Sequence, residues 1–158
     1  MISLGTVYDT RNYALGIFAR CTSLKTIPAN LFASMTKVTL MPGIFYECKA
    51  LTNIPEGLFD HNPEVIYISY SFEGCSNLQS VPAGLFDKMR ILQSTTRLFY
   101  GCQSLTGESP YTLINGKKVH LYERQNYPTE FLEITNHNNT FGNCTNLTDH
   151  ESMPNDWR

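Results

Sequence analysis

Apolar residues recur along this chain every 27 residues, in register and separated by mostly polar stretches. Four units carry a phenylalanine, a cysteine three residues later and a leucine three residues after that. The first three units continue with isoleucine or valine, proline and the pair Leu-Phe. Similarity at a fixed period of about 20 to 50 residues is typical of chains whose units bury their apolar faces only against neighbouring units. The repeated pairs are Phe18 and Cys21, Phe45 and Cys48, Phe72 and Cys75, Phe99 and Cys102.

A weaker periodicity inside each unit indicates two similar sides. Leu51 and Ile54 are echoed 14 residues later by Val65 and Ile68. Proline after the Leu-x-x-Ile stretch lacks an N–H group and suits the first position of a helix. We therefore expect a short strand at Leu-x-x-Ile, single helical turns at Leu-Phe and Phe-x-x-Cys, and parallel pairing of successive coils. The predicted fold class is an α/β repeat solenoid, a right-handed coil of short parallel strands and short helical turns.

The pattern Phe-x-x-Cys-x-x-Leu-x-x-Ile-Pro resembles the BspA-like, or Treponema-type, leucine-rich repeats over residues 18–105. The unit here is longer than is usual for that family. The resemblance implies a leucine-rich-repeat coil and a place among bacterial surface proteins, many of them from anaerobic and gut-dwelling species. It implies an adhesin that contacts a protein or a glycan.

One domain is expected over residues 1–158, with a partial or capping coil at 1–17, the repeats at 18–106, and a hairpin insert, last coil and cap at 107–158. The next Phe-x-x-Cys, Phe141 and Cys144, comes 42 residues after Phe99, an excess of 15. Asn115-Gly116 favours a tight hairpin turn, so we expect strands near 111–114 and 118–122. Residues 1–17 have two interpretations: a natural cap, or the cut edge of a longer chain, open to an upstream domain or to self-association.

Composition narrows the range of functions. The net charge is −2 and lysines and arginines are scattered, which argues against a nucleic-acid partner. No apolar run approaches the length of a membrane span, so membrane insertion is not expected. The first residues lack the charged and apolar regions of a secretion signal. An extracellular or cell-surface location is therefore expected only if the domain is exported with a longer chain.

The sequence shows no catalytic constellation. The five cysteines are interpreted as buried thiols of a structural ladder, because stacked side chains would point the same way, and disulfides would leave one cysteine over. The histidines have no metal-ligand spacing, although His137 and His150 near Asp149 offer one alternative cation site. No nucleophile elbow or phosphate loop occurs. We expect no enzyme activity, cofactor or metal.

Candidate ligand contacts are non-core positions, because repeat proteins bind through their broad faces. Thr26, Asn53 and Ser80 make one small, polar face, and tyrosines gather on the other side and in the insert, where rigid aromatics suit protein or glycan contacts. The alternative for the tyrosines is packing at the core boundary, and for the insert a capping hairpin. The remaining candidates are Tyr67, Tyr70, Tyr100, Tyr111, Lys117, Tyr122 and Arg124.

The leading functional hypothesis is a non-enzymatic binding or adhesion module of a bacterial surface protein. The second is a structural or receptor-facing domain of a larger assembly, such as a phage or prophage tail protein. Both place the function where the regular pattern fails, in the insert and at the N-terminal edge.

Overall fold

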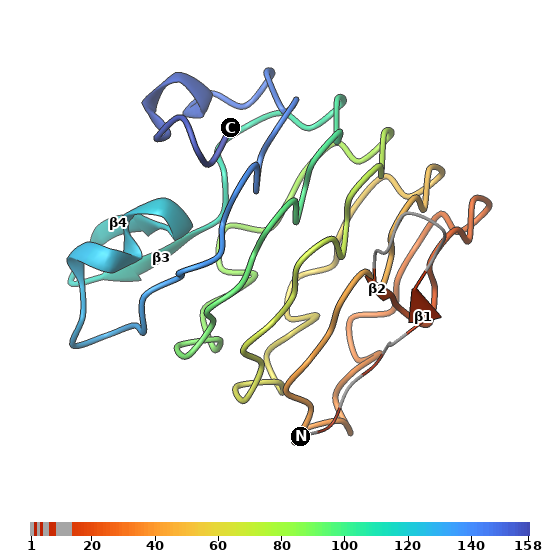
Figure 1. Ribbon diagram of the computed structural model, residues 1–158, viewed down its shortest axis with the longest axis horizontal. Helices are drawn as coiled ribbons and strands as arrows, with labels where there is room; N and C mark the ends of the chain where they lie inside the picture. The colour runs from red at the N-terminus through yellow and green to blue at the C-terminus, as the bar shows by residue number, and fades with distance from the viewer. Residues whose placement is uncertain (1, 3, 5–6, 9–13) are drawn as a thin grey trace.

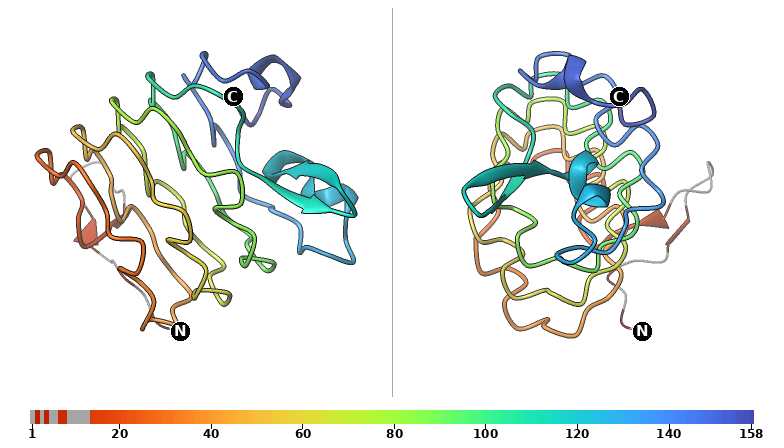
Figure 2. Two further views of the ribbon diagram at one scale, coloured as in Figure 1. Left: turned by 180° about the vertical axis from the view of Figure 1, so that it is seen from behind. Right: turned by 90° about the vertical axis from the view of Figure 1, so that its left-hand side faces the viewer.

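The chain winds through successive turns that lie side by side around a shared interior (Figure 1). This computed structural model describes residues 2, 4, 7–8 and 14–158. Seen along the stack, the turns superpose and the insert crosses one end (Figure 2). The elements are β1 (Val7–Tyr8), β2 (Ala14–Leu15), β3 (Tyr111–Ile114), β4 (Lys117–His120), and the 3-10 helices η1 (Leu121–Asn126) and η2 (His150–Ser152).

The predicted α/β repeat solenoid is wrong, and so is the description of the chain as a leucine-rich-repeat protein. The described residues contain no α-helix, and their strands form two antiparallel pairs, β1–β2 and β3–β4, rather than a parallel sheet. Regular secondary structure is sparse in every turn between Gly16 and Pro110. The 27-residue spacing instead corresponds to a series of turns joined by side-chain and single-residue contacts.

Backbone dihedral angles explain why Phe-x-x-Cys does not form a helical turn. The residue just before the cysteine is left-handed, with φ of 55° at Glu47, 74° at Gly74 and 76° at Gly101. A right-handed helix cannot continue through such a residue. The backbone instead makes separate four-residue turns, with the N–H of Cys48 donating to the Phe45 carbonyl at 3.0 Å.

The expected strands are reduced to isolated parallel bridges. Leu40 bridges to Tyr67, Tyr67 to Ser94 and Asn53 to Ser80, each pair 27 residues apart. Single residues of neighbouring turns therefore pair in parallel without extending into a strand. The two-residue β1–β2 pair lies at the N-terminal end of the chain.

Stacked phenylalanine rings form the interior. The rings of Phe18, Phe45, Phe72, Phe99 and Phe141 follow one another at centroid distances of 5.4–5.5 Å, nearly parallel. A second column, Phe32, Phe59 and Phe86, stacks at 5.9 and 6.1 Å. All these rings except Phe18 are at most 2% exposed. Offset and edge contacts between rings add to the stabilisation from burial.

The cysteines are free thiols that tie neighbouring turns together. The Sγ of Cys48 donates to the Phe18 carbonyl at 3.1 Å, and Cys75 does the same to Phe45 at 3.2 Å. Cys102 and Cys144 repeat the contact further along. Burial raises the pKa of the thiols from Cys48 to Cys144, so these four behave as small core residues. Cys21, by contrast, is exposed.

The two ends are closed differently. At the C-terminal end the backbone adds one more layer, since the N–H of Phe141 donates to the Trp157 carbonyl at 2.8 Å. At the other end Gly16 donates to the Gly43 carbonyl, and a Cβ on Gly16 would lie 2.3 Å from the Ile44 Cα, so only glycine fits. Within the predicted partial coil 1–17, residues 1, 3, 5–6 and 9–13 lie outside the described residues.

Candidate functional site

The insert that interrupts the regular spacing begins with the hairpin expected at Asn115-Gly116. β3 and β4 pair antiparallel, with Ile114 opposite Lys117, so the second strand begins one residue and ends two residues earlier than expected. Both turn residues have positive φ, 51° and 79°. The hairpin is joined to the wound part of the chain where the Tyr111 N–H donates to the Ala83 carbonyl at 2.8 Å.

Arg124, in η1, holds the insert against the wound part of the chain. Arg124 is 2% exposed, and its guanidinium donates to the carbonyls of Met89 and Phe86, both at 2.9 Å, and to the Thr112 hydroxyl. It also lies 4.3 Å from the Phe131 ring centroid. Burial, and then the charge of Arg90, lower the pKa of Arg124 to about 9, which leaves it charged at neutral pH.

A shallow groove runs along the junction between the wound chain and the hairpin. It consists of two hollows of about 260 Å³ each, which share Ala83, Gly84 and Asp87. We call it the junction groove; its further lining residues are Glu56, Gly57, Asp60, Pro82, Lys88, Arg90, Tyr111, Thr112 and Leu113. Its volume and open shape suit a side chain or a sugar ring rather than a buried cofactor.

Two aspartates sit at equivalent positions of successive turns along the groove. The carboxylate of Asp87 covers Gly84 so closely that a Cβ there would lie 2.8 Å from Oδ2, and Asp60 lies similarly over Gly57. The buried Oδ1 of Asp87 accepts no hydrogen bond within the described part of the chain. An unpaired acceptor of this kind is costly unless a donor reaches it.

The hairpin contributes apolar and aromatic groups to the groove. Leu113 is 61% exposed, the highest fraction among the large apolar side chains that the structure describes. Tyr111 is partly buried, and the ammonium of Lys118 lies 4.7 Å from its ring centroid. The groove therefore combines carboxylates, cations and an apolar edge within one surface.

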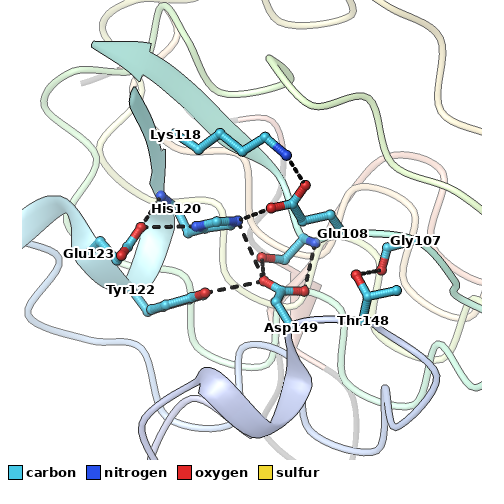
Figure 3. Close-up of polar contacts among 9 residues, drawn as sticks. Gly107, Glu108, Lys118, His120, Tyr122, Glu123, Thr148 and Asp149 are labelled. Atoms are coloured by element: carbon cyan, nitrogen blue, oxygen red, sulfur yellow. Dashed lines mark hydrogen bonds and ion pairs between the residues drawn. The ribbon is translucent and has the colours of Figure 1, made fainter. Parts of the chain in front are cut away.

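A polar cluster is centred on His120, the β3–β4 strand partner of the groove residue Tyr111 (Figure 3). The Nδ1 atom of this imidazole is 2.9 Å from Oε2 of Glu123, and Nε2 is 3.1 Å from Oε1 of Glu108 and 3.7 Å from Oδ2 of Asp149. The residue is 8% exposed. We define the His120 cluster by its members, His120, Glu108, Ser109, Lys118, Tyr122, Glu123 and Asp149.

The cluster joins three distant segments. Glu108 and Ser109 follow the last regular turn, His120 and Glu123 belong to the insert, and Asp149 precedes η2. Asp149 accepts hydrogen bonds from the backbone N–H and the hydroxyl of Ser109 and from the hydroxyl of Tyr122. These contacts fix the hairpin against the C-terminal end of the stack.

Charges in the cluster shift the neighbouring groups. Burial by itself would raise the pKa of Glu123, but hydrogen bonds from the backbone N–H and ring of His120 outweigh it and lower that pKa. Burial, followed by the charge of Asp149, raises the pKa of Tyr122 well above its ordinary value. A hydrogen bond to Glu108 raises the pKa of Lys118. The lowered pKa keeps Glu123 ionised, and the raised pKa keeps the Tyr122 phenol neutral.

The His120 cluster links separate segments of the chain and contains no nucleophile–base pair. The Ser109 hydroxyl donates to Asp149 instead of His120, and both ring nitrogens of His120 already face carboxylates. Among the described residues, no group of three or more His, Cys, Asp and Glu could hold a metal ion. His137 and His150, the alternative cation site, contact different carboxylates, Asp156 and Glu151.

Thr26, Asn53 and Ser80, the residues of the predicted polar face, are all exposed. Asn53 and Ser80 form a bridge and a side-chain hydrogen bond of 3.3 Å, while Thr26 lines a separate apolar pocket at the N-terminal end. Tyr67, Tyr70 and Tyr100 are partly buried on the wound chain, and Arg97 lies 3.7 Å from the ring centroid of Tyr100. None of these residues lines the junction groove.

The four candidates in the insert divide into two pairs. Tyr111 lines the groove, and Lys117 is exposed with its ammonium 5.7 Å from the Tyr127 ring centroid. Tyr122 and Arg124 are buried and hold the insert in place, so their side chains are not offered to a surface ligand. The sequence interpretation of these two as ligand contacts does not fit their positions.

Sequence reasoning missed most of the His120 cluster. Asp149 lies 40 residues after Ser109 and shares no sequence pattern with it or with Glu108. One local signal was available, since Glu123 follows His120 by three residues and accepts its backbone N–H at 2.9 Å, as in a capping box.

No helix in the described part of the chain has the length and apolar character needed to cross a membrane. Comparison with known proteins yields no match to this chain among protein-family models, curated proteins or solved structures.

Proposed function

We propose that this protein is a non-enzymatic binding module that recognises a protein or glycan through the junction groove. The observation that carries the proposal is the position of the groove. It lies where the insert meets the regular turns, and its hairpin edge presents Leu113 at 61% exposure beside Tyr111. Exposed apolar and aromatic groups within a polar rim are typical of binding surfaces.

The chemistry of the groove is compatible with both ligand classes. Asp60 and Asp87 supply acceptors for hydroxyl or amide donors, and Lys88 and Arg90 supply donors. A tyrosine ring beside carboxylates is suited to stacking on a sugar face or packing against an aliphatic side chain. Resemblance of the Phe-x-x-Cys pattern to BspA-like surface proteins supports a host or bacterial surface as the source of the ligand, and a cell-surface location when the domain is exported within a longer chain.

Binding of the isolated domain to a glycan array and to intact bacterial or epithelial cells tests the proposal. Leu113→Asp and Tyr111→Ala should each weaken binding about tenfold or more, because each removes a contact in the groove. Leu132→Asp is the matched control, since Leu132 is also exposed, at 48%, but does not line the groove. Absence of binding, or equal losses for all three variants, would overturn the proposal.

A second candidate function, a junction within a larger assembly such as a phage or prophage tail, is favoured by the N-terminal end. An apolar pocket of about 70 Å³ opens there, lined by Phe18, Leu24, Thr26, Ile27, Pro28, Leu31 and Phe45. Leu24 and Leu31 are only partly buried, whereas their equivalents Leu51 and Leu58 are 0% and 1% exposed.

Sedimentation velocity distinguishes the second candidate. Concentration-dependent association that Leu31→Asp abolishes, together with cell binding that Leu113→Asp leaves unchanged, would favour the assembly role over the groove. If the protein sediments as a monomer at every concentration, copies of the chain do not associate through the N-terminal end.

A further inference from the structure

Charged groups are distributed unevenly along the junction groove. One of its two hollows, which we call the acidic hollow, is lined by the carboxylates of Glu56, Asp60 and Asp87. The other residues around it are glycine, proline and alanine, so none of the described residues that line it is a cation. The second hollow contains the lysine and the arginine of the groove and its apolar edge at Leu113.

Neighbouring cations form their contacts elsewhere. Arg90 donates to the backbone carbonyl of Asp87 at 2.8 Å and pairs with Glu130 at 3.5 Å. Arg124 is close enough to Asp87 for their charges to interact, but it donates its hydrogen bonds to two backbone carbonyls and to the Thr112 hydroxyl. In the described part of the chain, no lysine or arginine forms an ion pair with a carboxylate of the acidic hollow. A cation on a ligand would therefore meet acceptors that the protein does not use for ion pairs of its own.

The two aspartates of the acidic hollow are not required by the local backbone. In the first turn, Asn30 and Ala33 occupy the positions of Gly57 and Asp60. The Ala33 N–H donates to the Asn30 carbonyl at 3.1 Å, as the Asp60 N–H does to the Gly57 carbonyl at 3.1 Å, and Asp87 repeats this hydrogen bond at 3.0 Å. The same turn thus forms with alanine, and the carboxylates occur in the two turns that line the groove.

A protein segment fits this surface better than a sugar does. Hydrogen bonds from a charged donor to a carboxylate are about twice as strong as those between neutral groups, and sugar hydroxyls are neutral. The Tyr111 ring already contacts the Lys118 ammonium, 4.7 Å from its centroid, and the His120 imidazole at 5.6 Å, which leaves less of it for a sugar face. Leu113, which is exposed, can pack against an apolar side chain of a partner.

We propose that the junction groove binds a segment of a partner protein that places a lysine or arginine side chain in the acidic hollow and, close to it in sequence, an apolar side chain against Leu113. The two hollows share Ala83, Gly84 and Asp87, so neighbouring side chains of one segment reach both. The proposal rests on the proposed function of the groove, and it selects a protein over a glycan as the ligand.

A library of random short peptides displayed on phage, selected against the isolated domain, tests the ligand class. Selected peptides should be enriched in lysine or arginine beside an apolar residue. In a synthetic copy of one such peptide, glutamate in place of the cationic residue should weaken binding about tenfold or more, as measured by fluorescence anisotropy. Added salt should weaken binding of the original peptide as well. Selection of acidic or uncharged peptides, or of none, would overturn the proposal.

Variants of the protein locate the cation. Asp60→Asn with Asp87→Asn should weaken binding of the selected peptide about tenfold or more, because the amides keep the size of the carboxylates and remove their charge. Asp60 is exposed, so Asp60→Asn alone provides the test if the double variant does not fold. Glu64→Gln with Asp156→Asn is the matched control, since it removes as many carboxylates from residues outside the groove. Equal losses in the two double variants would overturn the proposal.

The proposed function and the choice of ligand fail separately. Glycan binding that Leu113→Asp weakens, in a domain that selects no basic peptide, would remove the protein ligand and leave the groove function. Peptide binding that is lost in the Asp60→Asn and Asp87→Asn variant but unchanged in Leu113→Asp would contradict the groove function and leave a cation site in the acidic hollow.

Discussion

Asn62 and Arg124 make the same contact on two different turns of the chain. The Nδ2 of Asn62 donates to the carbonyls of Phe32 and Met35 at 3.1 and 3.0 Å, and the guanidinium of Arg124 donates to those of Phe86 and Met89, both at 2.9 Å. The two acceptor pairs stand 54 residues apart, twice the 27-residue spacing. Asn62 comes from the next turn, and Arg124 comes from the insert.

Arg124→Met should lower the free energy of unfolding by about 3 kcal/mol, because two buried carbonyls lose their donors. Chemical denaturation measures the loss. Arg90→Met is the matched control: Arg90 also lies over the Phe131 ring, at 4.8 Å, but its side chain is 41% exposed. We expect less than about 1 kcal/mol for the control. Equal losses would show that the ring contact matters more than the carbonyl contact.

Asn62→Leu should cost about 2 kcal/mol for the same reason, since Asn62 is fully buried and its amide serves two carbonyls. The loss in the double variant with Arg124→Met should equal the sum of the single losses, because the two sites share no partner. A neutral Asn62→Leu, measured by urea unfolding, would mean that burial of the leucine offsets the lost hydrogen bonds.

Phe72→Ala should destabilise the fold by about 3–5 kcal/mol, because the ring is buried between the rings of Phe45 and Phe99. Phe18→Ala should cost distinctly less, since Phe18 is only partly buried at the N-terminal end. Thermal unfolding followed by calorimetry compares the two. The same loss at both positions would contradict the expectation that Phe18, at the end of the stack, contributes less to stability than Phe72.

Stability should decline at alkaline pH through the buried thiols. Burial raises the pKa of Cys48 to about 11 and that of Cys144 to about 12 from an ordinary value of 9.0. The unfolded chain therefore loses these protons first, so their contribution is complete below about pH 9 and falls as the pH rises towards 11 to 12. Urea midpoints across this interval measure the decline. Cys48→Ala with Cys144→Ala should make it shallower without removing it, because Cys75 and Cys102 are buried as well.

A thiol reagent provides a companion measurement. In the native protein Cys21 is exposed and should react at once, while the four buried thiols should react only as the protein unfolds. The denatured chain should yield five free thiols. Fast labelling of more than one thiol in the native state would contradict the burial of the remaining four.

The recurring apolar columns of the sequence correspond to the stacked interior, whereas the secondary structure predicted for them is wrong. Its 27-residue columns identify which rings stack, because aromatic burial follows directly from the apolar pattern. The helical turns and parallel strands predicted for the repeated units are wrong, since left-handed residues such as Glu47, which no pattern marked, end each turn after a few residues. Asn115-Gly116 was readable because positive φ at both positions is a strong local preference of these residues.

The His120 cluster could not be predicted from the sequence for a different reason. Its charges come from three segments whose proximity depends on the whole winding, as with Ser109 and Asp149, 40 residues apart. The same reason explains why Tyr122 and Arg124 were predicted as ligand contacts although both are buried. Residue type alone does not distinguish a side chain that packs at the end of the stack from one that contacts a ligand.

The unequal ends of the stack limit how copies of this molecule can associate. One end is sealed by the insert and by the layer that Trp157 completes, and the other leaves Leu24 and Leu31 partly uncovered. A surface available at one end only can pair with itself across a two-fold axis, which closes after two copies. Association through that end would therefore yield dimers of fixed size, and fibres would require a second, separate surface.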